Sequence, residues 1–145
     1  MAMHDGGTRN EGSTIPAIAV GALTYLVLSF LRTELNRHST ALTSNHWYVP
    51  FDASLAFLIA LTTGFVAASM YRQREMAMGF CACAVGEIAR GIIKLLVAVY
   101  GAGFAVAINL PGAAVLDIFT NALPSGILGA AGGAVAVVLL RNRSK

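Results

Sequence analysis

The chain has 145 residues, of which 57% are hydrophobic and only 12% are charged, and its mean hydropathy is +0.70. A typical soluble domain carries about twice this share of charged residues, so the composition excludes a soluble globular protein and predicts an integral membrane protein. The net charge of +3 would suit nucleic-acid binding in a soluble protein, but here the basic residues gather at the ends of hydrophobic runs. Because this is the pattern of topology signals, we expect no nucleic-acid partner.

The first predicted helix follows a polar tail. Residues 1–14 are rich in Gly, Ser, Thr and Asn and are predicted to form a flexible cytoplasmic tail, which leaves residues 15–145 as one transmembrane domain. Residues 15–31 form an apolar run with Pro16 in its first turn, a position that proline favours. Charged residues follow directly and no small-residue cleavage site lies close behind. We therefore interpret this run as a retained helix of ~25 Å and not as a signal peptide.

The second helix is predicted to follow a polar loop. Residues 32–48 are expected to form this loop, and Trp47 and Tyr48 at its end are the kind of aromatic pair that marks a membrane–water boundary. Residues 49–71 are predicted to be the second helix, with Asp52 in its first turn.

The third helix has a clear start and an open end. It is predicted to begin near Met76, after a tight polar turn, and to run past Lys94. An uninterrupted helix to residue 108 would be ~50 Å long, too long for a simple crossing, and Tyr100-Gly-Ala-Gly103 offers a break. Residues 95–110 are therefore predicted to form a half-helix, a re-entrant piece or an interfacial segment.

The fourth helix is predicted to end at Leu140, with residues 115–121 leading into it. It carries Gly126, Gly129 and Gly133, and small residues at such spacings allow helices to approach closely. We expect this face to pack within the bundle, with a homodimer interface as the alternative.

Four crossings would place both termini on the same side of the membrane as the turn at residues 72–75. Six basic residues lie on that side and two on the other. The six are Arg9, Arg72, Arg74, Arg141, Arg143 and Lys145. Because basic residues concentrate in cytoplasmic segments, the sequence predicts an all-α, four-helix protein of the inner (cytoplasmic) membrane with both termini in the cytoplasm.

Three ionisable residues interrupt the third apolar run. Glu87, Arg90 and Lys94 lie within an arc of roughly 60° on one helix face. A charge facing lipid would cost several kcal/mol, so this face is expected to meet other helices or water.

Other polar residues are predicted to reach a similar depth on neighbouring helices. Counted at 1.5 Å per residue from the cytoplasmic helix ends, Asp52, Lys94 and Asn121 all lie ~27–28 Å along their helices, with Asp117 one turn further out. We predict that Asp52, Glu87, Arg90, Lys94, Asp117 and Asn121 form one outward-facing polar cluster. The alternative is that Lys94 snorkels to the interface and that the two aspartates cap helices.

The order of these features resembles the VanZ-like family of small four-helix membrane proteins. The resemblance covers residues 49–143 and rests on Asp52 at a helix start, Arg72-Gln-Arg74 at its end and Glu87 midway along the next helix. The stretch Leu116-Asp117-Ile-Phe-Thr-Asn121 then precedes a Gly/Ala-rich helix that ends in Arg141-Asn-Arg143. The chain departs from the family pattern at several positions. It has Ala53 and Ala56 where the family commonly has a basic residue and a histidine. In the family a glutamine often follows the glutamate of the third helix, where this chain has Arg90 nearby, and Pro124 stands where a glycine is usual. The resemblance implies a place in the cell envelope and a link to glycopeptide (teicoplanin) resistance, with no settled reaction.

Three functions are compatible with the predicted cluster. It could bind a polar or anionic headgroup, such as that of a lipid-linked envelope precursor, with Arg90 and Lys94 holding phosphate or carboxylate. It could instead relay protons or ions in a small transporter or pore, including a holin-like pore. Its charges could also be an internal clasp in a non-catalytic accessory subunit that assembles with other membrane subunits or with itself.

Catalysis and cofactors are not favoured by the sequence. It has no phosphate-cradling glycine loop, no metal-ligand spacing and no pairing of nucleophile with base. Cys81 and Cys83 point about 200° apart on a helix, so they cannot bridge each other and make a poor metal pair. We therefore expect a protein without cofactor or metal, more readily a binding or accessory protein than an enzyme.

Overall fold

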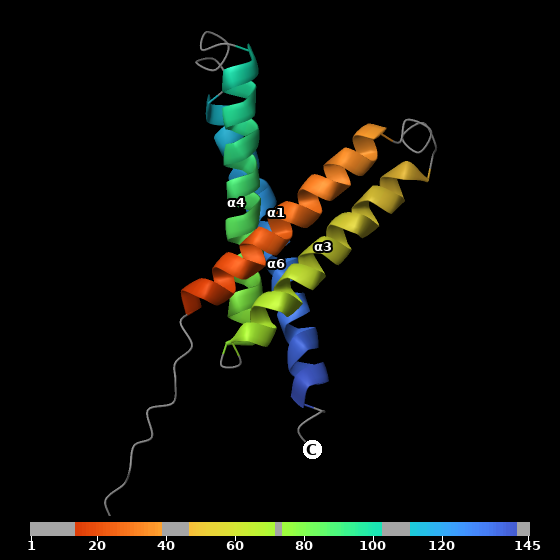
Figure 1. The fold of residues 1–145 in the computed structure, drawn as a ribbon, viewed down its shortest axis with the longest axis vertical. Coiled ribbons are helices and arrows are strands. Elements are labelled where there is room, and N and C mark those ends of the chain that lie inside the picture. The colour runs from red at the N-terminus through yellow and green to blue at the C-terminus, as the bar shows by residue number, and fades with distance from the viewer. Residues whose placement is uncertain (1–13, 39–46, 72–73, 103–110, 142–145) are drawn as a thin grey trace, which may run out of the picture.

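Four helices make up nearly all of the computed structural model, which describes residues 14–38, 47–71, 74–102 and 111–141. Figure 1 shows them in chain order. They are α1 (Thr14–His38), α3 (Tyr48–Met70), α4 (Glu75–Ala102) and α6 (Pro111–Arg141).

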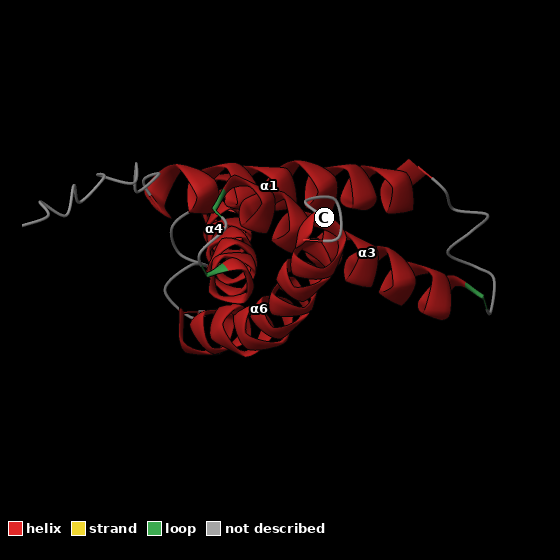
Figure 2. Ribbon diagram, turned by 90° about the horizontal axis from the view of Figure 1, so that it is seen from below, coloured by secondary structure: helices red, strands yellow, loops and turns green. Residues whose placement is uncertain are grey.

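The helices form two antiparallel pairs that cross each other. α1 lies beside α3, and α4 lies along α6 in the most extensive contact of the molecule (Figure 1). The start of α1, the end of α3, the start of α4 and the end of α6 all lie toward one end of the bundle. Toward the opposite end the α1–α3 pair diverges from the α4–α6 pair, and Figure 2, seen from below, shows the end of α1 and the start of α3 extending sideways away from α4 and α6.

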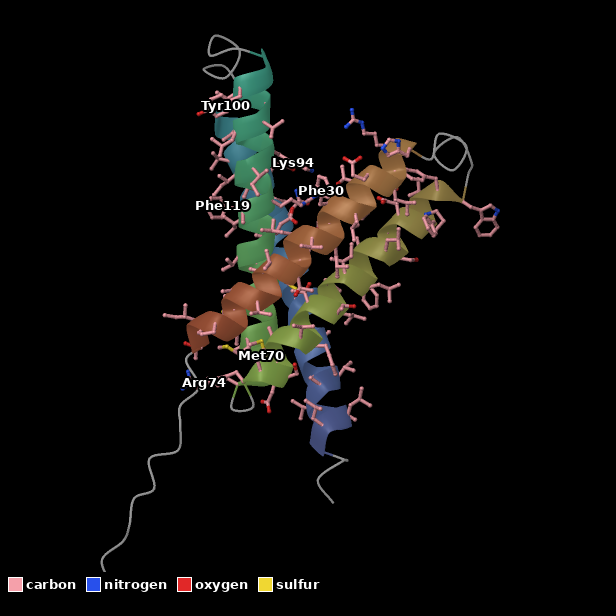
Figure 3. All side chains as sticks on the ribbon, viewed as in Figure 1. Phe30, Met70, Arg74, Lys94, Tyr100 and Phe119 are labelled. Carbon is pink, nitrogen blue, oxygen red and sulfur yellow. The ribbon has the colours of Figure 1, made fainter. Side chains whose placement is uncertain are left out.

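Small residues fill the core, whereas large apolar residues cover the outside. The buried side chains are mainly alanines, and Leu23, Phe30 and Ile127 are among the large apolar residues that are more than half exposed. Figure 3 shows such side chains projecting outward, Tyr100 and Phe119 among them. This distribution is the reverse of a water-soluble fold and suits a hydrocarbon solvent.

Three of the helices are long and apolar enough to cross a membrane: α1, α3 and residues 115–140 of α6. The chain is therefore an all-helical, multi-pass membrane protein. α4 has 28 residues, which is also long enough for a crossing, but it carries Glu87, Arg90 and Lys94 in its interior. Its crossing and the orientation of the termini are proposals.

Close packing at the crossing depends on glycines from three helices. A Cβ atom at Gly64 of α3 or at Gly79 of α4 would collide with the backbone of Gly129 on α6. A Cβ at Gly129 would in turn lie 2.6 Å from the Sγ atom of Cys83. Real Cβ atoms do not come this close to other heavy atoms, so only glycine allows these three backbones to meet.

The other two glycines expected to pack also face neighbouring elements. A Cβ at Gly126 would lie 2.7 Å from the Phe80 ring, and one at Gly133 would meet the backbone of Glu75 and Met76. The face that carries them is used within the chain.

The prediction of a polar loop from residue 32 was wrong for its first seven residues. α1 continues as a helix to His38. The extension contains no glycine or proline, and Glu34 lies within ion-pair distance of Arg37 and His38, at the three- and four-residue spacings of a helix. Polarity alone does not indicate a loop, because polar residues at helical spacing are compatible with a helix that leaves the membrane.

The other boundaries differ less from the predictions. α3 begins at Tyr48, one residue before the predicted start, so Asp52 lies just beyond its first turn. α4 runs to Ala102, within the predicted break, so residues 95–102 continue the helix. The remainder of the predicted half-helix or re-entrant segment, residues 103–110, lies outside the described residues. α6 begins at Pro111, earlier than expected, and Pro124 lies inside it.

Candidate functional site

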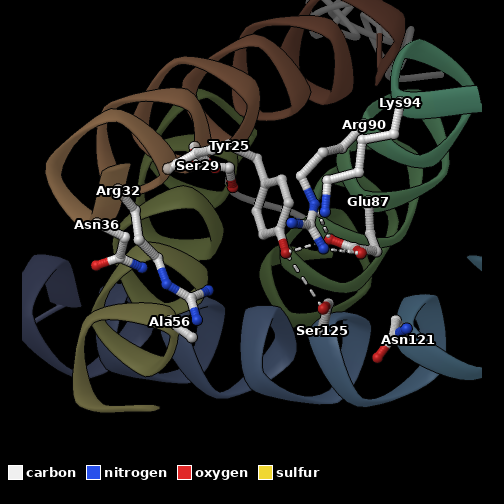
Figure 4. A pocket seen from close by; sticks show the side chains of 11 residues that line it. Tyr25, Ser29, Arg32, Asn36, Ala56, Glu87, Arg90, Lys94, Asn121 and Ser125 are labelled. Atoms are coloured by element: carbon white, nitrogen blue, oxygen red, sulfur yellow. Dashed lines mark hydrogen bonds and ion pairs between the residues drawn. The ribbon is translucent and has the colours of Figure 1, made fainter. Parts of the chain in front are cut away.

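A polar cavity of about 440 Å³ lies between the helices toward the end where the two pairs diverge. All four helices contribute to it, and Figure 4 shows its lining from close by. The lining residues are Tyr25, Ser29, Arg32, Thr33, Asn36, Ala56, Glu87, Arg90, Lys94, Asn121 and Ser125.

A hydrogen-bonded group that includes a buried carboxylate forms one wall of the cavity. Glu87 is only 4% exposed. Its Oε2 atom accepts hydrogen bonds from the Tyr25 hydroxyl at 2.6 Å and from Nε of Arg90 at 2.9 Å, and its Oε1 atom pairs with Nη2 of Arg90. The Tyr25 hydroxyl also lies 3.3 Å from the hydroxyl of Ser125. The group therefore connects α1, α4 and α6, and the charge of Glu87 is neutralised on its own helix.

A second charged group connects α1 to α3. Nε of Arg32 donates to Oδ1 of Asp52 at 2.7 Å, and Nη2 of Arg32 pairs with Oδ2. Nδ2 of Asn36 donates to the same Oδ1 atom at 2.8 Å. The bidentate geometry is the strong form of an arginine–carboxylate pair. It holds the last turns of α1, which lie beyond the apolar run, against α3.

Lys94 differs from both arginines. It lines the cavity one turn along α4 from Arg90, and among the described residues no carboxylate lies within ion-pair distance of its amino group. Figure 4 shows its side chain running beside that of Arg90. Arg32 and Arg90 are thus each paired with a carboxylate, whereas Lys94 has no ion-pair partner in the described part of the site.

The structure divides the six residues of the predicted cluster. Glu87, Arg90, Lys94 and Asn121 line the same cavity. Asp52 lies behind Arg32 and reaches the site only through that residue. Asp117 is not part of the lining, and its Oδ1 atom accepts a hydrogen bond of 3.0 Å from Nδ2 of Asn121.

The sequence reasoning missed the contribution of α1. Polar side chains of α1 line the cavity, although the sequence pattern predicts an apolar helix and a loop for this stretch. They include Tyr25, Ser29, Arg32 and Asn36. Their spacings of four, three and four residues place them on one helix face. A polar stripe at this spacing, which continues past the end of the apolar run, was the signal that could have found them.

The donor set is suited to an anion. Within the described segments no group of three or more His, Cys, Asp or Glu side chains is placed to hold a metal ion. Arg32 and Arg90 each bind a carboxylate through Nε and Nη2, and among the described residues the Nη1 atoms of these two arginines have no hydrogen-bond partner. Nη1 and the Lys94 amino group are therefore available to a ligand, and both bind phosphate or carboxylate well.

No family model, curated protein or solved structure matches this chain. Fold and site define a class, a multi-pass helical membrane protein with a polar cavity among its helices. The VanZ-like resemblance stays a prediction from the sequence, without support from these comparisons.

Proposed function

We propose that the protein binds an anionic group, a phosphate or a carboxylate, in the polar cavity between its helices. The observation that carries this proposal is Lys94, which lines a cavity of about 440 Å³ without a carboxylate partner among the described residues. A charge that serves only to hold helices together would be expected to have its counter-ion in the protein, as Arg32 and Arg90 have.

The two ion pairs hold the guanidinium groups of Arg32 and Arg90 in place and leave some of their hydrogen-bond donors free for a ligand. Glu87 and Asp52 fix the planes of the two guanidinium groups, which leaves their remaining donors in defined positions. A bound anion would thus meet a site that is already arranged, and would lose less free energy in ordering side chains.

The orientation and location of the site are part of the same proposal. With both termini in the cytoplasm of a cell with an inner membrane, the cavity would lie toward the outer face of that membrane. If the VanZ-like resemblance is right, the anion belongs to a component of the cell envelope. A proton relay, or an internal clasp in an accessory subunit, predicts no dependence of anion binding on Lys94.

Binding of glycerol phosphate, a water-soluble anion, tests this function. The purified full chain in detergent is titrated with glycerol phosphate in a calorimeter, with glycerol as the neutral control. Lys94→Gln is expected to weaken binding by about fivefold, the effect of losing one partly exposed ion pair. Arg74→Gln is the matched control, because Arg74 is exposed just before the start of α4, away from the cavity.

Two results would contradict the proposal. One is the absence of any binding that depends on the phosphate charge. The other is equal weakening by Lys94→Gln and Arg74→Gln, which would mean that only the net charge of the protein matters.

A further inference from the structure

A second cavity, of about 660 Å³, adjoins the first between α1 and α4. Most of its lining is apolar and comes from facing stretches of these two helices. The apolar lining residues are Leu26, Val27, Phe30, Leu31, Ile93, Val97 and Ala98. We call this cavity the α1–α4 groove.

The groove and the polar cavity are continuous. Ser29, Thr33, Arg90 and Lys94 line both of them. A molecule that occupied both would have its polar part beside Lys94 and Arg90 and its apolar part between α1 and α4. This is the arrangement of an amphiphile, in which a charged headgroup is attached directly to a hydrocarbon chain.

The exposed apolar side chains beside the groove suit contact with hydrocarbon. Phe30, Leu31 and Val97 on its walls are each more than half exposed, at 64%, 57% and 66%. Neither water nor an empty space is a favourable occupant of the apolar part of the groove, since water finds no polar partners there and an empty groove forfeits dispersion contacts. The bilayer itself supplies hydrocarbon chains.

We propose that the anion of the polar cavity is the headgroup of an anionic lipid, whose chain lies in the α1–α4 groove. This inference rests on the proposed function and adds the class of ligand and its route, which is sideways from the bilayer between α1 and α4. The hydrocarbon chain of the lipid gains little free energy from moving out of the bilayer into the groove. Selectivity therefore comes from the headgroup, because the junction of the two cavities carries the positive charge of Lys94.

A transmembrane helix of a partner could also cover an apolar groove. It would leave the adjoining polar cavity unfilled unless it carried an acidic side chain at the level of Lys94. A lipid fills both cavities with one molecule, and we commit to it for that reason.

The test compares two lipids and two matched substitutions. Native mass spectrometry of the full chain in detergent measures how much phosphatidylglycerol, which is anionic, and phosphatidylcholine, which is neutral overall, stay bound. The wild-type chain is expected to retain phosphatidylglycerol about fivefold better, the value of one partly exposed ion pair. Ala98→Trp fills the groove, and it should lower phosphatidylglycerol to the level of phosphatidylcholine.

The control and the soluble ligand separate this inference from the proposed function. Ala77→Trp adds the same bulk at an exposed position of α4 outside the groove and should behave like the wild-type chain. Ala98→Trp should leave binding of glycerol phosphate unchanged, because this probe has no hydrocarbon chain to occupy the groove. Val27→Trp, on the α1 wall, repeats the experiment if Ala98→Trp does not fold.

Three outcomes would overturn the lipid assignment. The first is equal retention of the two lipids by the wild-type chain. The second is unchanged retention of phosphatidylglycerol in Ala98→Trp and Val27→Trp. The third is a wild-type dimer that Ala98→Trp converts to a monomer without a change in bound lipid, which would give the groove to a second copy of the chain. Each of these leaves the result with glycerol phosphate to decide the proposed function independently.

Discussion

Glu87 shows how a carboxylate is accommodated in an apolar helix. Both of its oxygens are engaged by Arg90, and Tyr25 donates a further hydrogen bond from α1. The pair with Arg90 lies within one helix and cannot by itself hold two helices together. Tyr25 and Ser125 make it an interhelical group, whereas Arg32 and Asp52 connect two helices directly.

The two partners of the Glu87–Arg90 pair differ in burial, and this difference leads to a prediction. The side chain of Glu87 is 5% exposed and that of Arg90 is 26% exposed. Arg90→Gln leaves a buried carboxylate without its counter-ion and should lower the free energy of unfolding by about 3–5 kcal/mol. Glu87→Gln leaves a cation that can turn toward the cavity, and should cost only about 1–3 kcal/mol.

The double variant provides the test. Glu87→Gln with Arg90→Gln removes both charges and should be more stable than Arg90→Gln alone, as measured by equilibrium unfolding in detergent. Additive losses in this double-mutant cycle would show that the two side chains are not coupled in solution.

At the scale of the helices, the contact of Gly64, Gly79 and Gly129 determines how closely α3, α4 and α6 approach. Gly129→Leu should lower the free energy of unfolding by about 3 kcal/mol or more, because its side chain would meet backbone atoms that cannot move aside. Ala131→Leu adds comparable bulk to an exposed position on the same helix and should change stability by less than about 0.5 kcal/mol. Thermal unfolding in detergent measures both. Similar losses for the two variants would mean that α6 does not pack through this face.

How far the sequence predicted these elements depended on the type of signal. Hydropathy located all four helices, because apolar runs long enough to cross a membrane are uncommon outside membrane-spanning segments. Helical periodicity placed Glu87, Arg90 and Lys94 on one face of α4. Hydropathy failed at the end of α1, where the helix continues beyond the apolar run and Arg32 and Asn36 bind Asp52.

The candidate site could be predicted only in part for a related reason. Residues on one helix, such as Glu87, Arg90 and Lys94, share a face by periodicity alone. Depth along a helix placed Asp52 and Asn121 at the same level, with Asp117 one turn further out, but depth says nothing about the direction in which a side chain points. The structure turns Asp52 toward Arg32 and pairs Asp117 with Asn121.

For the whole molecule, the two helix pairs cross near one end and diverge at the other, and the polar cavity lies toward the diverging end. This gives the protein two unlike ends. The end where α3 stops and α4 starts is closed by glycine contacts such as that of Gly133 with the backbone of Glu75 and Met76. The diverging end combines the cavity with the α1–α4 groove. The side of the membrane that each end faces therefore decides which leaflet could supply a ligand.

The last prediction concerns this orientation. We expect the end of α1 to lie outside the cell and the start of α4 to lie in the cytoplasm, because six basic residues against two favour that orientation. In a background with Cys81 and Cys83 replaced by alanine, His38→Cys should react with a membrane-impermeant maleimide added to intact cells, and Arg74→Cys should react only after the cells are opened. Both positions are exposed, so accessibility within the protein does not limit either reaction. Arg74→Cys removes one of the six basic residues and leaves the bias in place. The reverse labelling pattern would put the cavity and the groove at the cytoplasmic face, and an anionic lipid would then have to come from the inner leaflet.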